Sequence, residues 1–140
     1  RFWVNHPDTW LIIIGGREPD TSTCELAASV KSSSHIILIK YMSNPFPVVK
    51  ACDFFLLSSY YEAGLVVPEA DILGVPAAAC DINGARAFIR QYGGTLLPNS
   101  EDGLVQGMEM FVEGKIHTMH VDYEKRNQDI LSKCEKLFME

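Results

Sequence analysis

Two acidic residues, Glu62 and Glu69, are the strongest candidates in this chain for binding chemistry. They lie in the stretch 58–76, SSYYEAGLVVPEADILGVP, with Gly64 and an apolar run between them. The residues at the start of this stretch, Phe54–Ser59, have the pattern of a buried strand, and its end has the pattern of a short helix. A carboxylate at the end of a buried strand loses solvation energy unless it binds something. Two carboxylates at one loop–helix junction therefore predict a site that binds hydroxyl groups.

The predicted junction suggests a role for each of its residues. In open α/β sheets, ligands bind beyond the carboxyl ends of the strands. Gly64 would let a backbone amide approach a ligand there, and Pro68 suits the first position of a helix. Glu69 then falls in the first helical turn, where free amides attract phosphate and the carboxylate itself can accept from the hydroxyls of a ribose. Glu62 could accept from the hydroxyls of a sugar. The alternative is that Glu69 is only a helix-start carboxylate and Glu62 a solvated loop residue.

The elements that must position this junction alternate between strands and helices along the chain. Apolar runs bounded by turn residues predict five strands, the first of them buried on both faces: Trp10–Gly16, His35–Tyr41, Phe54–Ser59, Pro76–Asp81 and Thr95–Pro98. Helical spacing predicts six helices, the fifth capped by Ser100: Thr21–Ser32, Pro45–Cys52, Pro68–Leu73, Gly84–Tyr92, Glu101–Val112 and Asp122–Phe138. This alternation predicts an α/β fold with a doubly wound parallel sheet, in a single domain over residues 1–140.

The first residues of the chain suggest that it continues a longer one. Arg1–Val4 has the pattern of the last turn of a helix, and Asn5–Asp8 that of a turn into a strand. A doubly wound sheet normally opens with a strand, so we expect the chain to be a fragment of a larger protein. The alternative is a frayed terminus that needs nothing before it.

Composition excludes several classes of partner. The 140 residues carry a formal net charge of −6, which argues against binding nucleic acid or an anionic membrane through charge. The sequence shows no signal peptide and no apolar run long enough to span a membrane. The four cysteines form no C-x-x-C pair, which favours free thiols and a cytoplasmic location: Cys24, Cys52, Cys80 and Cys134. His117, His120 and Asp122 could hold a metal, but we interpret them as a polar loop and predict no metal site.

A family resemblance refines these predictions. From Asn44 to Gly114 the chain resembles the C-terminal, donor-binding half of a GT-B glycosyltransferase of the family 4, or group 1, type. The matching strings are NPFPVVKACDFFLLSS, YEAGLVVPEADILGVP, DINGARAFI and YGGTLLPNSEDGL, and LIIIGG at Leu11–Gly16 fits as well. The strings YGGTLLPNSEDGLVQGM and VDYEK are similar to modules found beside polyol-phosphate, teichoic-acid-type transferases in bacteria. The resemblance implies a Rossmann-like fold and transfer of a sugar from a nucleotide-sugar to a cell-surface glycan or polyol.

The resemblance also implies site residues. Members carry a Glu-x7-Glu motif, whose first Glu lies near the donor sugar and whose second binds the ribose. Glu62 corresponds to the first and would be the catalytic residue, although only six residues separate it from Glu69. Gly64, Leu65 and Glu69 would bind the donor, with the Gly64 backbone facing the sugar. Lys40–Met42 would end the second strand near the base. No metal or other cofactor is implied.

Parts of the family pattern are missing. The segment with the first strand and the Arg/Lys pair for the donor diphosphate is absent, as is the N-terminal acceptor domain. Retaining transfer takes place between the two halves, so this chain is not expected to be active alone. Full enzymes of this type would work in the cytoplasm, where other parts of the protein could reach the inner face of the membrane. The alternative function is a non-catalytic nucleotide-binding or interaction module, and a phospho-acceptor signalling domain ranks below both.

The missing strand has a structural consequence. In the strand order 3-2-1-4-5-6 it lies centrally, so Leu11–Gly16 and Phe54–Ser59 lose their common neighbour. Unpaired buried backbone groups cost about 1–3 kcal/mol each. We therefore expect one of three outcomes: the two strands pair directly, another chain fills the position, or the domain is poorly stable. The C-terminal helix often crosses to the other domain in GT-B enzymes, so part of its apolar stripe could be exposed instead of packed in the core.

Overall fold

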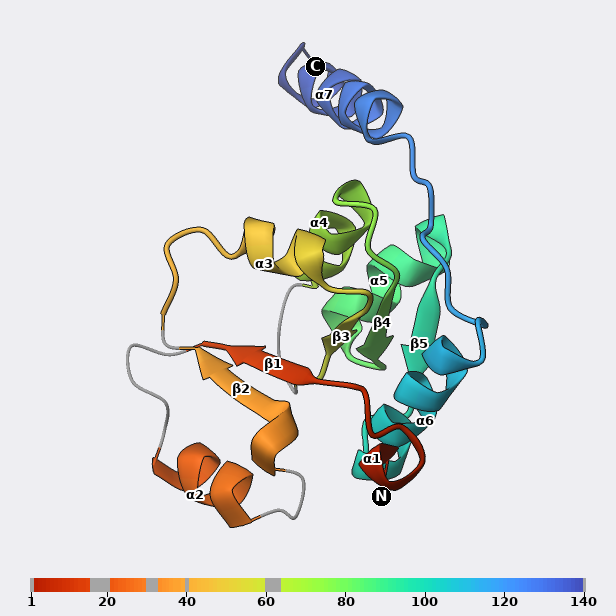
Figure 1. Ribbon diagram of the computed structural model, residues 1–140. Helices are drawn as coiled ribbons and strands as arrows, with labels where there is room; N and C mark the ends of the chain where they lie inside the picture. The colour runs from red at the N-terminus through yellow and green to blue at the C-terminus, as the bar shows by residue number, and fades with distance from the viewer. Residues whose placement is uncertain (1, 16–20, 30–32, 40, 60–63, 140) are drawn as a thin grey trace. The chain divides into compact units, whose positions relative to one another are not determined.

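The computed structural model describes residues 2–15, 21–29, 33–39, 41–59 and 64–139 (Figure 1). The chain divides into two compact units, Arg1–Val48 and Val49–Glu140. Each unit is described below by itself. The proposal of a single domain over residues 1–140 stays a prediction.

The first unit contains a two-stranded parallel sheet. Its elements are α1 (Phe2–Asn5), β1 (Leu11–Ile14), α2 (Thr21–Ser29), η1 (Ser33–His35) and β2 (Ile36–Ile39), and α3 (Phe46–Ala51) lies at the division. Strand β1 pairs with β2 in parallel, with Leu11 opposite Ile36. Ile13 of β1 and Ile37 of β2 remain 39% and 40% exposed. Burial of the first strand on both faces is therefore only partly realised.

A polar cluster fixes the turn that leads into β1. The backbone oxygen of Thr9 accepts from Trp3 Nε1 at 3.1 Å and lies 3.1 Å from Nδ1 of His35. The Thr9 hydroxyl donates to the backbone oxygen of His6 at 2.7 Å. These bonds tie α1 to the start of the β1–β2 pair. The helical turn predicted at Arg1–Val4 is found at Phe2–Asn5, so Asn5 lies in the helix and not in the turn that follows.

The second unit contains a three-stranded parallel sheet in the order β3-β4-β5. Its elements are β3 (Phe55–Leu57), α4 (Val66–Ile72), β4 (Ala77–Cys80), α5 (Asn83–Tyr92), β5 (Thr95–Leu97), α6 (Glu101–Val112) and α7 (Tyr123–Met139). The central strand is AAAC, and all four of its residues are buried. Alanine has low strand propensity, but burial between two neighbours overrides that preference and the small side chains let helices approach closely.

Helices cover both faces of this sheet. Side chains alternate along β4, so Ala77 and Ala79 pack in one core with residues of α4 and α5. Ala78 faces the other way, into a core with Leu97 and Ile116 against which α6 packs. The sheet is therefore doubly wound, as the sequence predicts.

The pairing of strands within each sheet is the one expected for the strand order 3-2-1-4-5-6 when strand 1 is left out. Strands β1 and β2 correspond to its second and third strands, and β3, β4 and β5 to its last three. The described strands form one sheet in each unit. The three expected outcomes for the position of the missing strand stay predictions.

The ends of two helices test the sequence rules. The Ser100 hydroxyl accepts from the Gly103 N–H at 3.1 Å, which confirms the predicted cap of α6. Helix α4 begins at Val66 rather than at Pro68, so the proline is its third residue and not its first. Proline is tolerated there because the first-turn N–H groups of a helix have no intrahelical acceptor.

A buried carboxylate anchors the segment that leads to α7. Asp71 of α4 is 8% exposed and accepts from the Met119 N–H at 2.6 Å and the Tyr123 hydroxyl at 2.9 Å. The N–H groups of His120 and Val121 add longer bonds of 3.3 Å and 3.4 Å. Burial, followed by the bond to Asp71, raises the pKa of Tyr123 above its usual value. Residues 119–123 are thus fixed against α4.

Helix α7 contains no buried residue. Its exposed apolar side chains include Leu131, Leu137 and Phe138, which are 62%, 76% and 90% exposed. The apolar stripe is therefore exposed along much of its length, which agrees with the expectation that part of it is exposed and disagrees with the alternative of core packing. No helix in the described part of the chain is long and apolar enough to cross a membrane.

Candidate functional site

The predicted donor-binding residues lie at the carboxyl edge of the β3–β4 pair. Because parallel neighbours end at the same edge, Gly64 before α4 and the start of α5 after β4 meet there. Gly64, Leu65 and Glu69 lie at the start of α4, on the β3 side of this edge. The predicted catalytic residue, Glu62, lies outside the described residues, and so does Lys40.

Gly64 joins the two sides of the edge. It has φ +76°, and a Cβ atom built on it would lie 2.7 Å from the backbone nitrogen of Ala85. Its carbonyl accepts from the Val67 N–H at 3.2 Å and so starts α4. The need for glycine thus comes from backbone packing against α5. The sequence had suggested a different reason, the approach of a ligand.

Glu69 has the environment of a side chain that can bind a ligand. It is half-buried in the first turn of α4, and its N–H donates to the backbone oxygen of Leu65 at 3.2 Å. Its carboxylate has no hydrogen bond or ion pair with any described residue. Leu65, just before the helix, is 62% exposed. A carboxylate that loses water without gaining a partner is available to accept from hydroxyl groups.

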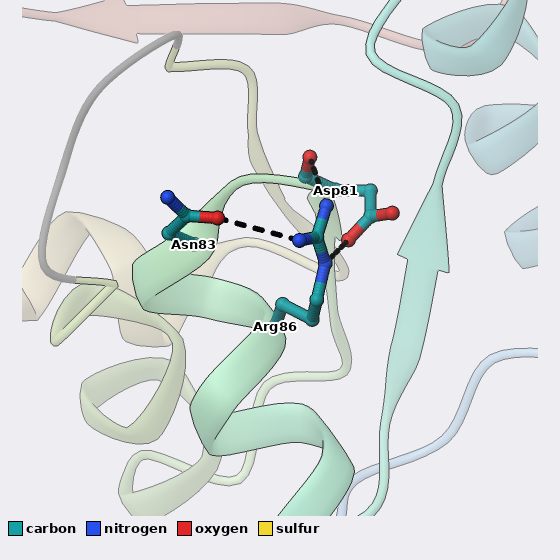
Figure 2. Close-up of polar contacts among 3 residues, drawn as sticks. All are labelled: Asp81, Asn83 and Arg86. Carbon is teal, nitrogen blue, oxygen red and sulfur yellow. Dashed lines mark hydrogen bonds and ion pairs between the residues drawn. The ribbon is translucent and has the colours of Figure 1, made fainter.

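The turn after β4 adds a polar cluster that the sequence did not single out (Figure 2). Arg86 Nε donates to Asp81 Oδ1 at 2.6 Å, and Nη1 donates to Asn83 Oδ1 at 3.3 Å. Its Nη2 donates to the backbone oxygen of Asp81 at 3.4 Å. The side-chain hydrogen bond between Arg86 Nε and Asp81 Oδ1, together with the attraction of the guanidinium, lowers the pKa of Asp81. The same contacts raise the pKa of Arg86.

The Asp81–Arg86 pair sets the charge at this edge. Asp81 directly follows β4, and Arg86 lies in the first turns of α5. The sequence signal that could have predicted this ion pair is an acidic residue just after a strand with a basic residue five positions later. Asn83 begins α5 and Gly84 follows, as expected. The pair leaves Glu69 as the carboxylate without a partner at the described edge. No group of three or more His, Cys, Asp or Glu residues suited to a metal occurs in the part of the chain that the structure describes.

Comparison with known proteins identifies the family. The family model described as "Glycosyl transferases group 1" matches residues 1–128. The chain belongs to this family. The match confirms the resemblance stated from the sequence, including the glycosyltransferase class.

Solved glycosyltransferase structures confirm the fold. The structure titled "Crystal Structure of TarM" superposes with a TM-score of 0.77 at 19% identity, over 98% of this chain and 30% of that one. A pneumococcal O-GlcNAc transferase, GtfA, in complex with UDP and GlcNAc, superposes with a TM-score of 0.68 at 21% identity, over 97% of this chain and 30% of that one. The fold is the Rossmann-like fold of GT-B glycosyltransferases. The chain spans about 30% of the length of these structures. A comparison with curated proteins found no match.

Proposed function

We propose that the chain is the donor-binding half of a retaining glycosyltransferase that uses a nucleotide-sugar. The observation that carries the proposal is the family match over residues 1–128. The acceptor would be a cell-surface glycan or polyol, bound by a further domain of the same protein. Support for a further domain comes from the matched structures, of which this chain covers 30%. The chain alone would bind the donor without transferring the sugar.

The carboxyl edge of the second sheet would hold the donor. Glu69 would accept from the ribose hydroxyls, which is supported by its half-buried carboxylate without a partner among the described residues. Gly64 and Leu65 would present their backbone to the donor, and Glu62 would lie near the sugar. Asp81, held by Arg86, would form the opposite rim of the site. Binding would need no metal ion.

A nucleotide titration followed by NMR tests this proposal. We expect uridine, guanosine, cytidine or adenosine diphosphate to shift the amide signals of Gly64–Ala70 and of the turn at Asp81. Uridine diphosphate is the first probe, because GtfA was solved with UDP. The shifts should persist when EDTA removes divalent metal. Absence of shifts with all four diphosphates at millimolar concentration, in a folded sample, would contradict donor binding.

A matched pair of substitutions tests the role of Glu69. Hydrogen bonds to a charged group contribute about 1.5–3 kcal/mol, so Glu69→Ala should weaken nucleotide binding by at least about tenfold. Glu101 also lies in the first turn of a helix, α6, so Glu101→Ala is the control that should leave the affinity unchanged. Equal affinities of the two variants would remove the ribose role from Glu69.

The second candidate function is a non-catalytic nucleotide-binding module. The observation that favours it is the Glu62–Glu69 spacing, which has six intervening residues instead of seven. Inserting one residue before Gly64 restores the family spacing. If the full-length protein transfers sugar only with that insertion, the module function is supported; transfer by the unchanged full-length protein supports the enzyme.

A further inference from the structure

A groove outside the proposed donor site lies between the end of α5 and helix α7. It has a volume of about 570 Å³. Tyr92 lines one side, the segment 119–122 its base, and α7 the other side through Lys125, Arg126 and Lys133. This volume lies within the range of about 300–1,000 Å³ that small-molecule sites occupy.

Arg126 is held in this groove by aromatic rings. Its guanidinium carbon lies 5.7 Å from the ring centre of Phe88 and 5.5 Å from that of Tyr92. The two rings, one turn apart on α5, are themselves 4.9 Å apart. The guanidinium therefore lies over two adjacent rings, which attract its charge and leave N–H groups to bind acceptors. The guanidinium is therefore oriented before any ligand arrives.

No acceptor in the described part of the chain uses those N–H groups. The Nε atom of Arg126 is buried and has no hydrogen-bond partner there. Its backbone N–H donates to the backbone oxygen of Asp122 at 3.0 Å, a bond that does not involve the guanidinium. A buried donor without an acceptor is unfavourable, and a native example calls for an explanation such as an ion or ligand.

The charges around Arg126 favour an anion. Lys125 and Lys133 line the groove with it, against two carboxylates, Asp122 and Asp129, so the formal sum of these five residues is +1. Asp122 already accepts from the Lys125 N–H at 3.0 Å. Asp129 forms no ion pair with the described cations. A positive groove in a chain of net charge −6 is a local feature of α7 and not a property of the whole surface.

The base of the groove is fixed in place. Asp71 binds the N–H groups of residues 119–121 and the hydroxyl of Tyr123, as described above. His120, within this segment, has φ +54°, a conformation that non-glycine residues adopt rarely and that is enriched at functional sites. The groove is therefore formed without its ligand.

We propose that this groove is a second ligand site, which binds an oxyanion: the phosphate or carboxylate group of a small molecule. The Nη groups of the Arg126 guanidinium would donate to oxygens of the anion, and Lys125 and Lys133 would add charge. The site lies at the far end of α5 from Ala85, which packs against Gly64 at the donor edge. Tyr92 follows Ala85 by seven residues, which span about 10 Å along the helix, so the two sites are separate. The proposal does not depend on the function proposed above.

Anion titrations followed by NMR test the site. Inorganic phosphate and acetate are added separately at constant ionic strength, with chloride as the balancing anion. We expect saturable shifts of the amide signals of Tyr92, residues 119–122 and Arg126 with phosphate, with acetate or with both. The anion that binds more tightly identifies the preferred ligand group, phosphate or carboxylate. No saturable shift at these residues with either anion would overturn the proposal. Shifts that chloride alone reproduces would overturn it as well.

Substitutions then locate the site. Arg126→Gln should weaken the binding of the effective anion by at least about tenfold. Lys136→Gln is the matched control, because Lys136 lies on α7 outside the groove lining, and it should change the affinity less than about twofold. If Arg126→Gln does not fold, the Lys125→Gln, Lys133→Gln double variant replaces it with the same expectation. Unchanged affinity in a folded groove variant would refute the assignment.

Discussion

Replacing Asp71 tests whether one carboxylate holds the segment that leads to α7. Asp71→Ala removes the acceptor for Met119 N–H at 2.6 Å and for the Tyr123 hydroxyl at 2.9 Å. Hydrogen bonds to a charged group contribute about 1.5–3 kcal/mol each. We take the lower value, because Met119 and Tyr123 are half-buried and reach water once released. The two shorter bonds then predict a loss of about 3 kcal/mol in the free energy of unfolding.

Urea denaturation and hydrogen exchange measure this loss. Besides the change in unfolding free energy, the amide hydrogens of residues 119–121 should exchange faster in Asp71→Ala, since their acceptor is gone. Tyr123→Phe removes one bond and should cost about half as much. In the double variant the two losses should not add, because they share the same bond. Asp129→Ala, an exposed carboxylate on α7, is the control and should change stability by less than about 0.5 kcal/mol.

A small effect would refute the reasoning. If folded Asp71→Ala loses less than about 1 kcal/mol, and residues 119–121 keep their protection, the carboxylate does not carry the anchor. Additive losses in the double variant would show that Asp71 and Tyr123 do not interact. Either result would also remove the support for a preformed base of the α7 groove.

Three further predictions concern the second unit. Ser100→Ala removes the cap of α6 and should cost about 1 kcal/mol in urea denaturation; no change would mean that the cap does not stabilise the helix. Gly103→Ala would place a Cβ atom against the backbone oxygen of Pro98 and should cost about 1–3 kcal/mol in the same assay, whereas a neutral result would contradict this packing. The Asp81 carboxyl should titrate by NMR below its ordinary pKa of 3.8, and Arg86→Gln should return it toward 3.8. Because the folded pKa is the lower one, the stability that Asp81 contributes is present above pH 3.8 and is lost as the pH falls through the folded pKa. A midpoint that the variant leaves unchanged would separate the shift from Arg86.

Local signals in the sequence predict much of the fold. The apolar runs place all five described strands, including the alanine strand β4 despite its low propensity. The limits of α6 agree with the sequence because Ser100 is a strong local cap. The predicted start of α4 is wrong. Leu65 caps the helix without a side-chain hydrogen bond and so gives no local signal, and Pro68 suggests a later start.

The rest depends on contacts that are distant in sequence. Asp71 could not be found from local patterns, because Met119 and Tyr123 follow it by 48 and 52 residues. The predicted donor-binding residues do share one edge with the turn at Asp81, but their binding roles stay predictions. The reason for Gly64 was missed because its close neighbour, Ala85, belongs to the next helix of the chain.

The packing of Gly64 against Ala85 has a consequence for protein engineering. The loop that carries the Glu69 helix and the turn that carries Asp81 touch through backbone atoms, with no side chain between them to absorb a shift. A graft of either segment alone from a relative would therefore misplace the other. Chimeras that exchange this edge of the sheet should replace both segments together.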